Sequence, residues 1–230
     1  MQYQHRFVDG QRIVWPLGKI VCVGRNYAEH AKELNNPVPV TPLLFMKPAT
    51  SAAPLKFPMH LPQQQGPCHF ETEIAVLVGD TIHALSADNI SDKIAGYGIG
   101  LDLTLRALQD ELKTKGHPWE MAKAFDGACP LSAFVPASLV SHPESLGLSA
   151  RINGQLRQQG FVSDMITPIF ELLAYISRFF TLQAGDVVMT GTPAGVGPLQ
   201  PGDALQLSLL LRGDNNNVTT LAEFNASVEL

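Results

Sequence analysis

Residues 70–79, Phe-Glu-Thr-Glu-Ile-Ala-Val-Leu-Val-Gly, combine the pattern of a buried strand with two acidic side chains. The aliphatic and β-branched run that ends at Gly79 is typical of a strand in the core of a sheet. Because side chains alternate along a strand, Glu71 and Glu73 point to the same face. Neighbouring carboxylates repel each other, and burying even one costs several kcal/mol unless it is paired or bound to a cation. A divalent metal ion would offset both penalties.

Asp102 is the best candidate for a third ligand. It ends an apolar, glycine-rich run, residues 94–102, that also has a strand pattern, and it stands between two leucines. Three carboxylates without a nearby His or Cys cluster favour a hard ion, Mg²⁺ or Mn²⁺, in oxygen coordination. Such a site leaves about three octahedral positions for water and substrate. The alternative, a pair of solvated glutamates at a strand end, stays open on this pattern alone.

Length and composition describe a globular chain without the features of a nucleic-acid or membrane protein. The 230 residues are 45% hydrophobic and 16% charged, which allows one large domain or two small ones and a sizeable core. The net charge is −5 without a basic block, so we expect no nucleic-acid partner. Three cysteines without a C-x-x-C spacing favour a reduced, cytoplasmic setting. No apolar run approaches the roughly 20 residues of a membrane span, so we expect no membrane partner.

The remaining patterns predict an N-terminal arm or edge strand, residues 1–18, and one domain, residues 19–230. Further strands are expected at 19–24, 44–46, 149–161 (a hairpin that turns at Asn153-Gly154), 187–190 and, as a closing pair, after Asp203. The alternate glycines of residues 94–102 indicate that something packs closely against that strand. Helices are expected at 27–34, at 104–115 and after Ser163 or Asp164, either of which could cap the last one. Residues 119–126 are expected to form a loop or short strand.

A second group of candidate site residues lies on these predicted helices and beside them. His30 and Glu33 are three apart, so a helix brings them to one face, where the carboxylate could orient the imidazole as a base. Arg106 and Gln109 have the same spacing and could grip a substrate carboxylate. Lys123 could face a developing negative charge. Each has an ordinary explanation as well, because polar helix faces and isolated lysines are usually solvated.

The segment 191–197, Gly-Thr-Pro-Ala-Gly-Val-Gly, resembles an anion-cradling loop, since its backbone N–H groups can face a ligand. It matches neither a P-loop nor a dinucleotide-binding fingerprint. A tight turn between strands explains it equally well. The chain has no G-x-S-x-G element, which argues against a serine hydrolase.

Four motifs resemble the fumarylacetoacetate hydrolase family, in particular its small, single-domain branch of acylpyruvase-like and oxaloacetate tautomerase-like proteins. They are, in chain order, Phe70-Glu71-Thr72-Glu73, Gly100-Leu101-Asp102-Leu103-Thr104, Lys123-Ala124-Phe125-Asp126, and residues 185–193 with Gly195-Val196-Gly197. The resemblance extends from about Lys19 to Asp203. It implies an α+β fold, a mixed β-sandwich roll with peripheral helices, and a homodimer.

The resemblance also implies roles for individual residues. Mg²⁺ or Mn²⁺ would be bound by Glu71, Glu73 and Asp102. A catalytic dyad on a mobile lid would consist of His30 and Glu33, with Lys123 as a further catalytic residue. Substrate would be bound by Arg25, Arg106, Gln109 and Thr192, the last at the substrate carboxylate.

The expected activity is metal-dependent chemistry on a small 2-oxo acid through a metal-bound enolate. The first hypothesis is hydrolysis of acylpyruvates to pyruvate and a carboxylic acid, with a water activated by His30 and Glu33. The alternative is keto–enol tautomerisation of oxaloacetate, with or without decarboxylation, because the same enolate serves each reaction. A non-catalytic module that binds 2-oxo acids or metal is a more remote alternative.

Overall fold

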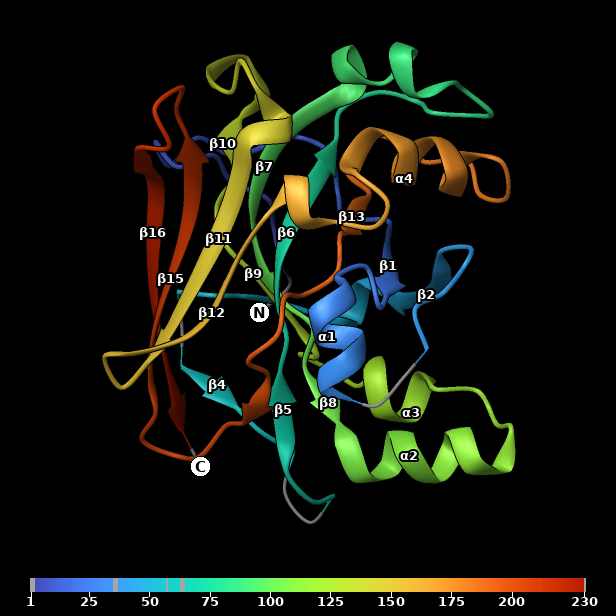
Figure 1. Ribbon diagram of the computed structural model, residues 1–230, viewed down its shortest axis with the longest axis vertical. Coiled ribbons are helices and arrows are strands. Elements are labelled where there is room, and N and C mark those ends of the chain that lie inside the picture. Colours follow the sequence, from blue (N-terminus) through green and yellow to red (C-terminus); the bar gives the residue numbers. More distant parts are fainter. Residues whose placement is uncertain (1–2, 35–36, 57, 63–64, 230) are drawn as a thin grey trace.

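The computed structural model describes residues 3–34, 37–56, 58–62 and 65–229, whose strands form three sheets (Figure 1). The largest has eight strands. Its path runs through β2 (Leu43–Pro48), β1 (Lys19–Gly24), β13 (Val187–Met189), β6 (Thr72–Val78), β7 (Ile94–Leu101), β9 (Cys129–Leu131) and β3 (Ala52–Pro54), and β10 (Val135–Pro136) pairs with β7. The sheet is mixed, because β1 with β13 and β3 with β9 are parallel whereas the other pairs are antiparallel.

A five-stranded sheet stands beside the large one in Figure 1. Its order is β12 (Gln155–Phe161), β11 (Leu146–Ile152), β15 (Ala204–Arg212), β16 (Val218–Glu229) and β4 (Met59–His60). The third sheet consists of β14 (Gly197–Pro198), β5 (Cys68–Phe70) and β8 (Thr104–Leu105). One buried apolar cluster contains Ile74 and Ile99 from the large sheet together with Leu148 and Leu207 from the five-stranded one. The expected α+β fold with mixed sheets is confirmed.

Strand β6 is the centre of this arrangement. Ile74, Val76 and Val78 belong to the cluster between the sheets, whereas Ala75 and Leu77 pack on the opposite face of the strand in a second cluster. All seven residues of the strand are buried. A strand covered on both faces reads as a continuous apolar run, which explains the sequence of residues 74–78.

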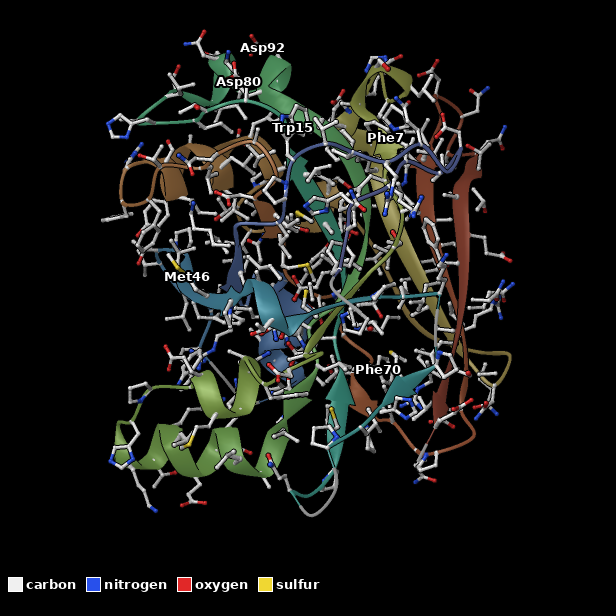
Figure 2. The ribbon with its side chains drawn as sticks, turned by 180° about the vertical axis from the view of Figure 1, so that it is seen from behind. Phe7, Trp15, Met46, Phe70, Asp80 and Asp92 are labelled. Atoms are coloured by element: carbon white, nitrogen blue, oxygen red, sulfur yellow. The ribbon has the colours of Figure 1, made fainter. Side chains whose placement is uncertain are left out.

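Among the described residues, four α-helices lie at the periphery: α1 (Ala28–Glu33), α2 (Arg106–Lys115), α3 (Glu120–Lys123) and α4 (Ile169–Ser177). Short 3-10 helices span Ala49–Ser51, Ala87–Asn89, Ser91–Lys93, Ala137–Leu139, Pro143–Ser145 and Val162–Asp164. Helices α1, α2 and α3 gather near the end of the large sheet where β6 begins and β7 ends (Figure 1). Figure 2 shows Phe70 toward this end, with Asp80 and Asp92 at the opposite end of the molecule. No helix in the described part of the chain is long and apolar enough to cross a membrane.

Three local predictions need correction. The second helix begins at Arg106, because residues 104 and 105 pair with β5 as strand β8 and extend the sheet before the chain turns. Residues 120–123 form a short helix and not a loop or strand. Neither candidate cap begins α4: Asp164 accepts the N–H of Phe161 at 2.9 Å within a 3-10 turn, and α4 starts after Pro168 without a side-chain cap.

Other local predictions agree with the structure. The hairpin turns at Asn153 and Gly154, whose φ angles are 52° and 79°, as a type I′ turn requires. At Gly96 and Gly98 a Cβ would lie 2.7 Å from the carbonyl oxygen of Val135 and 2.9 Å from the hydroxyl of Ser132. The close packing expected against this strand is therefore present.

The N-terminal arm folds back on itself and lies against the large sheet. Arg6 forms an isolated bridge with Arg12, and Phe7 forms one with Phe134. His5 is buried and its Nε2 lies 2.9 Å from the carbonyl oxygen of Gly185. Residues 1 and 2 of the predicted arm lie outside the described residues.

Candidate active site

The three predicted acidic ligands meet where β6 begins and β7 ends. Glu71 lies between β5 and β6, Glu73 is on β6 opposite Gly100, and Asp102 follows β7. The N–H of Asp102 donates to the carbonyl oxygen of Glu71 at 2.8 Å, which joins the two segments. Each acid offers a carboxylate oxygen, and these oxygens lie within 4.8 Å of one another. All three residues are buried, with 1–6% exposure, so they are not a solvated pair at a strand end.

Two cations from the peripheral helices lie directly against this cluster. Lys123 Nζ is 2.9 Å from Glu71 Oε2 and 2.6 Å from Asp102 Oδ2. The guanidinium of Arg106 binds Glu71 Oε1 and also donates to Gln109 Oε1 at 2.8 Å. The helices α2 and α3 therefore supply the positive charges that hold two of the buried carboxylates in place.

Lys47 is a site residue that the sequence analysis missed. It is fully buried on β2, and its Nζ lies 2.8 Å from Asp102 Oδ1. The same ammonium donates to the carbonyl oxygens of Lys123 and Ala128. A signal was available, because a lysine directly after the predicted buried strand of residues 44–46 needs an anionic partner.

The pKa values of Glu71 and Glu73 are shifted in opposite directions. Burial by itself would raise the pKa of Glu71, but Lys123 and Arg106 outweigh it and hold this pKa far below its usual range. Burial raises the pKa of Glu73 well above its usual value, and the nearby Asp102 and Glu71 carboxylates raise it further. The N–H of Gly191, 2.7 Å from Glu73 Oε2, opposes this shift only in part. Among the described residues, the ion pairs of the cluster involve Glu71 and Asp102 but not Glu73, so Glu73 is the acid that a bound cation would neutralise. The all-oxygen donors of the cluster suit Mg²⁺ or Mn²⁺.

This arrangement predicts that the metal-free protein loses stability as the pH rises. Glu73 binds its proton more tightly in the folded than in the unfolded state, so its contribution is complete below about pH 4.5 and is lost as the pH rises through the raised pKa. Glu71 acts in the opposite sense only below its usual pKa of 4.5, as the pH falls through its lowered pKa. His5 and His69, whose pKa values are lowered mainly by burial, act in the opposite sense up to their usual pKa of 6.5. In EDTA, the free energy of unfolding from urea titrations should therefore fall between about pH 7 and pH 8, by about 1.4 kcal/mol per pH unit for as long as the pH lies below the raised pKa of Glu73.

The variant Glu73→Gln removes this titration. We expect its stability to be flat over the same pH range and to exceed that of the parent protein at about pH 8. Glu120→Gln, at an exposed position of α3, is the matched control and should keep the parent slope. A parent protein whose stability did not fall with pH, or a Glu73→Gln variant with the parent slope, would contradict this account of the cluster.

The predicted dyad lies over the same region. His30 is 4% exposed, and its Nδ1 is 3.4 Å from Glu33 Oε2. Glu33 also accepts the N–H of Gly195, at 3.1 Å and 3.2 Å from its two oxygens. Gly195 has a φ of 102°, and a Cβ there would collide with the carbonyl oxygen of Arg157, so the position requires glycine. The 3.4 Å separation is long for a hydrogen bond, which is common for catalytic pairs without substrate.

The glycine-rich loop, residues 191–197, does cradle anions, but they are side chains of the protein itself. Gly191 donates to Glu73 and Gly195 donates to Glu33. Thr192 is 2% exposed, and its hydroxyl is held by the carbonyl oxygen of Thr72 at 2.8 Å and by Gln158 Nε2 at 2.7 Å. It is not among the residues that line the cavity of about 40 Å³ beside the acids, but it adjoins Gly191, which bonds Glu73, and it bonds the backbone between Glu71 and Glu73.

The remaining predicted residues line one cavity of about 40 Å³ beside the acids. Its walls include Arg25, His30, Glu71, Arg106, Gln109, Lys113 and Lys123, with Phe45 and Trp119 among the apolar members. A second cavity of about 520 Å³ shares Leu34, Arg106 and Lys113 with the first and extends to Glu33 and His69. A buried acidic cluster, a histidine and several cations thus converge on a space suited to a small anionic molecule.

Comparison with known protein families and structures shows to which family the chain belongs. Residues 19–228 match the family described as fumarylacetoacetate (FAA) hydrolase C-terminal. The chain belongs to the fumarylacetoacetate hydrolase family. A curated member, oxaloacetate tautomerase YcgM of Escherichia coli (strain K12), is 49% identical over 219 residues, which are 95% of this chain and 98% of that protein.

Two solved structures of the fumarylacetoacetate hydrolase family show the same fold. A putative fumarylacetoacetate isomerase/hydrolase from Oleispira antarctica superposes with a TM-score of 0.92 at 49% identity, over 98% of this chain and 100% of the other. The fumarylpyruvate hydrolase from Pseudomonas aeruginosa, in complex with Mn²⁺ and pyruvate, superposes with a TM-score of 0.89 at 33% identity, over 100% and 96% of the two chains. The family and fold implied by the four sequence motifs are confirmed.

Proposed function

We propose that this protein is a divalent-metal-dependent oxaloacetate keto–enol tautomerase. The buried acids and the dyad suit both tautomerisation and hydrolysis, so one observation carries the choice. The relative named oxaloacetate tautomerase is 49% identical over nearly the whole chain, whereas the solved fumarylpyruvate hydrolase is 33% identical. Acylpyruvate hydrolysis is the first hypothesis from the sequence, but the comparisons support its alternative, oxaloacetate tautomerisation, better.

The metal in this proposal would be held by Glu71, Glu73 and Asp102. One oxygen of each lies within 4.8 Å of one oxygen of each of the others, and the raised pKa of Glu73 supports a position beside this carboxyl group that a cation would occupy. When bound, Mg²⁺ or Mn²⁺ would act as a Lewis acid toward the 2-oxo group and so acidify the adjacent C–H bond. The Mn²⁺ and pyruvate in the relative from Pseudomonas aeruginosa support a divalent ion with a 2-oxo acid.

The proton transfer from C3 of the substrate is assigned to His30. Tautomerisation takes a proton from C3 of oxaloacetate and delivers one to the 2-oxo oxygen, so the substrate loses and gains no atoms. His30 accepts the C3 proton, and Glu33, 3.4 Å from its Nδ1, orients the imidazole and stabilises the imidazolium. Lys123, whose Nζ lies among the acids, stabilises the negative charge that develops on the 2-oxo oxygen.

Arg106 is assigned to the carboxylate next to the 2-oxo group. Its terminal nitrogens are held by Glu71 and by Gln109, which sets the plane of the guanidinium. Its Nε is buried and has no hydrogen-bond partner among the described residues. An anionic oxygen from the substrate would satisfy this donor, because a buried donor left without a partner costs about 1–3 kcal/mol.

The test is a parallel assay of the purified protein in Mg²⁺. Enol-oxaloacetate consumption is followed by its ultraviolet absorbance, and hydrolysis of acetylpyruvate and fumarylpyruvate by the release of pyruvate. We expect kcat/KM for tautomerisation to exceed that for hydrolysis by at least about 100-fold, with the activity lost in EDTA. A larger kcat/KM for hydrolysis would reverse the assignment.

Acylpyruvate hydrolysis is the second candidate. It is favoured by the likeness to the fumarylpyruvate hydrolase, since the same dyad could deprotonate a water that attacks the distal carbonyl.

A homodimer in the cytoplasm, expected from the resemblance and the cysteine pattern, is part of the proposal for either reaction. Sedimentation equilibrium of the purified protein tests the dimer.

A further inference from the structure

Helix α2 presents a row of three polar side chains to the candidate site. Arg106, Gln109 and Lys113 are three and four residues apart, so they share one face of the helix. All three line the cavity of about 40 Å³ that also contains Glu71 and Lys123. The first two have roles in the proposed reaction, whereas Lys113, one turn beyond Gln109, has none.

Lys113 stands where the small cavity meets the larger one. It lines both the 40 Å³ cavity and the adjoining cavity of about 520 Å³. Of the other residues that line these two cavities, only Leu34 and Arg106 line both. A substrate whose reacting end lies among the acids can extend toward this junction, or toward a further cavity of about 270 Å³ that shares Phe45, Trp119 and Lys123 with the small one. The charge of the lining residues distinguishes the two directions.

The charge around Lys113 favours an anion there. Its side chain is 26% exposed, and its Nζ is 3.6 Å from Asp110 Oδ1, on a side chain that is 63% exposed. Such a solvated pair contributes little. Burial lowers the pKa of Lys113, Asp110 opposes the shift, and the neighbouring cations Arg106 and Arg25 lower it further. By contrast, Lys123 deeper in the cavity is committed to Glu71 and Asp102.

The proposed substrate has negative charge at both ends, and cations lie at both ends of the cavity. Oxaloacetate has one carboxylate beside its reacting 2-oxo group and a second carboxylate at the other end, whereas the distal acyl group of acetylpyruvate is neutral. A charged distal group needs a cation, and a charge-assisted hydrogen bond to an ammonium supplies one. We propose that Lys113 is a specificity-determining residue that binds the distal carboxylate of a dicarboxylic 2-oxo acid, with Arg25 adding positive charge. This inference rests on the proposed function and extends it to the second end of the substrate.

The test compares oxaloacetate with its 4-ethyl ester, in which a neutral ester group replaces the distal carboxylate. Lys113→Met should raise KM for oxaloacetate about 10- to 100-fold, leave kcat nearly unchanged, and change KM for the ester less than about 2-fold. Lys113→Arg should restore most of the affinity for oxaloacetate. Lys115→Met is the matched control, because Lys115 is on the same helix, is 54% exposed and pairs with Glu111. It should behave as the parent protein does.

A calorimetric titration of both compounds in Mg²⁺ separates this inference from the proposed function. If Lys113→Met weakens the binding of oxaloacetate and not of the ester, Lys113 recognises the distal carboxylate, whatever the rate of turnover. Equal changes for both compounds, or no change for either, would overturn the inference. A parent protein that binds oxaloacetate without tautomerising it would overturn the proposed function and leave the binding result to decide the role of Lys113.

Discussion

Asp102→Asn should weaken the affinity of the protein for Mg²⁺ by at least about 100-fold and lower the rate of tautomerisation by a similar or larger factor. Asp102 supplies one of three carboxylates whose oxygens lie within 4.8 Å of one another, and an amide in its place carries no charge. The change also leaves Lys47 and Lys123 without the anion they share, so their positive charges would repel the ion. Calorimetric titration of Mg²⁺ measures the affinity directly.

The control for this variant is Asp88→Asn, which changes an exposed aspartate in the 3-10 helix Ala87–Asn89. It should bind Mg²⁺ as the parent protein does. Circular dichroism and thermal unfolding establish that Asp102→Asn is folded at the temperature of the titration. Unchanged Mg²⁺ affinity in a folded Asp102→Asn protein would exclude Asp102 as a ligand and leave the acidic cluster without a cation-binding role.

His30→Gln should lower kcat for oxaloacetate tautomerisation by about 10²- to 10⁴-fold, which is the usual contribution of a general base. His30 is buried over the cavity that contains Glu71 and Lys123. Glutamine has a similar size but cannot accept a proton at neutral pH. The affinity for Mg²⁺ should change less than about 2-fold, because His30 is not among the predicted ligands. Initial rates and calorimetry on the same preparation measure both quantities.

Two further variants test whether the effect on kcat is specific to His30. Glu33→Gln should have a smaller effect, about 10-fold, because Glu33 acts by orienting the imidazole. His142→Gln changes a histidine that is 71% exposed and should keep the parent rate. If His30→Gln turned over oxaloacetate at the parent rate, another group would have to remove the C3 proton, and the dyad would have no part in the reaction.

Patterns of short range in the sequence predicted much of the fold. The apolar run of residues 74–78, the helix at Ala28–Glu33 and the turn at Asn153-Gly154 all follow from backbone periodicity and allowed φ angles within about ten residues. The same rules failed at residues 104–105, where pairing with β5 took precedence over helix propensity. Local preference decides an element only where no distant partner competes for its backbone.

The candidate site was predictable in its residue types, in the meeting of its three acids and in the pair His30–Glu33, but not in its other contacts. That Glu71 and Glu73 share a face follows from strand alternation, and four motifs pointed to the family. The backbone hydrogen bond from Asp102 to Glu71, the ion pair of Lys47 with Asp102 and the position of Lys113 between two cavities depend on how strands and helices distant in the sequence are brought together. Sheet register and helix packing are set by the whole core, so no window of sequence contains them.

The glycine-rich loop shows which of its properties follow from the sequence and which from the tertiary structure. Its sequence alone determined that residues 191–197 could present backbone N–H groups to an anion, because glycine permits the required positive φ. Only the tertiary structure decided which anions those are, by bringing Glu73 from β6 and Glu33 from α1 to the N–H groups of Gly191 and Gly195. The physical reason is that conformational freedom is a property of a residue, whereas a partner is supplied by the packing of the rest of the chain.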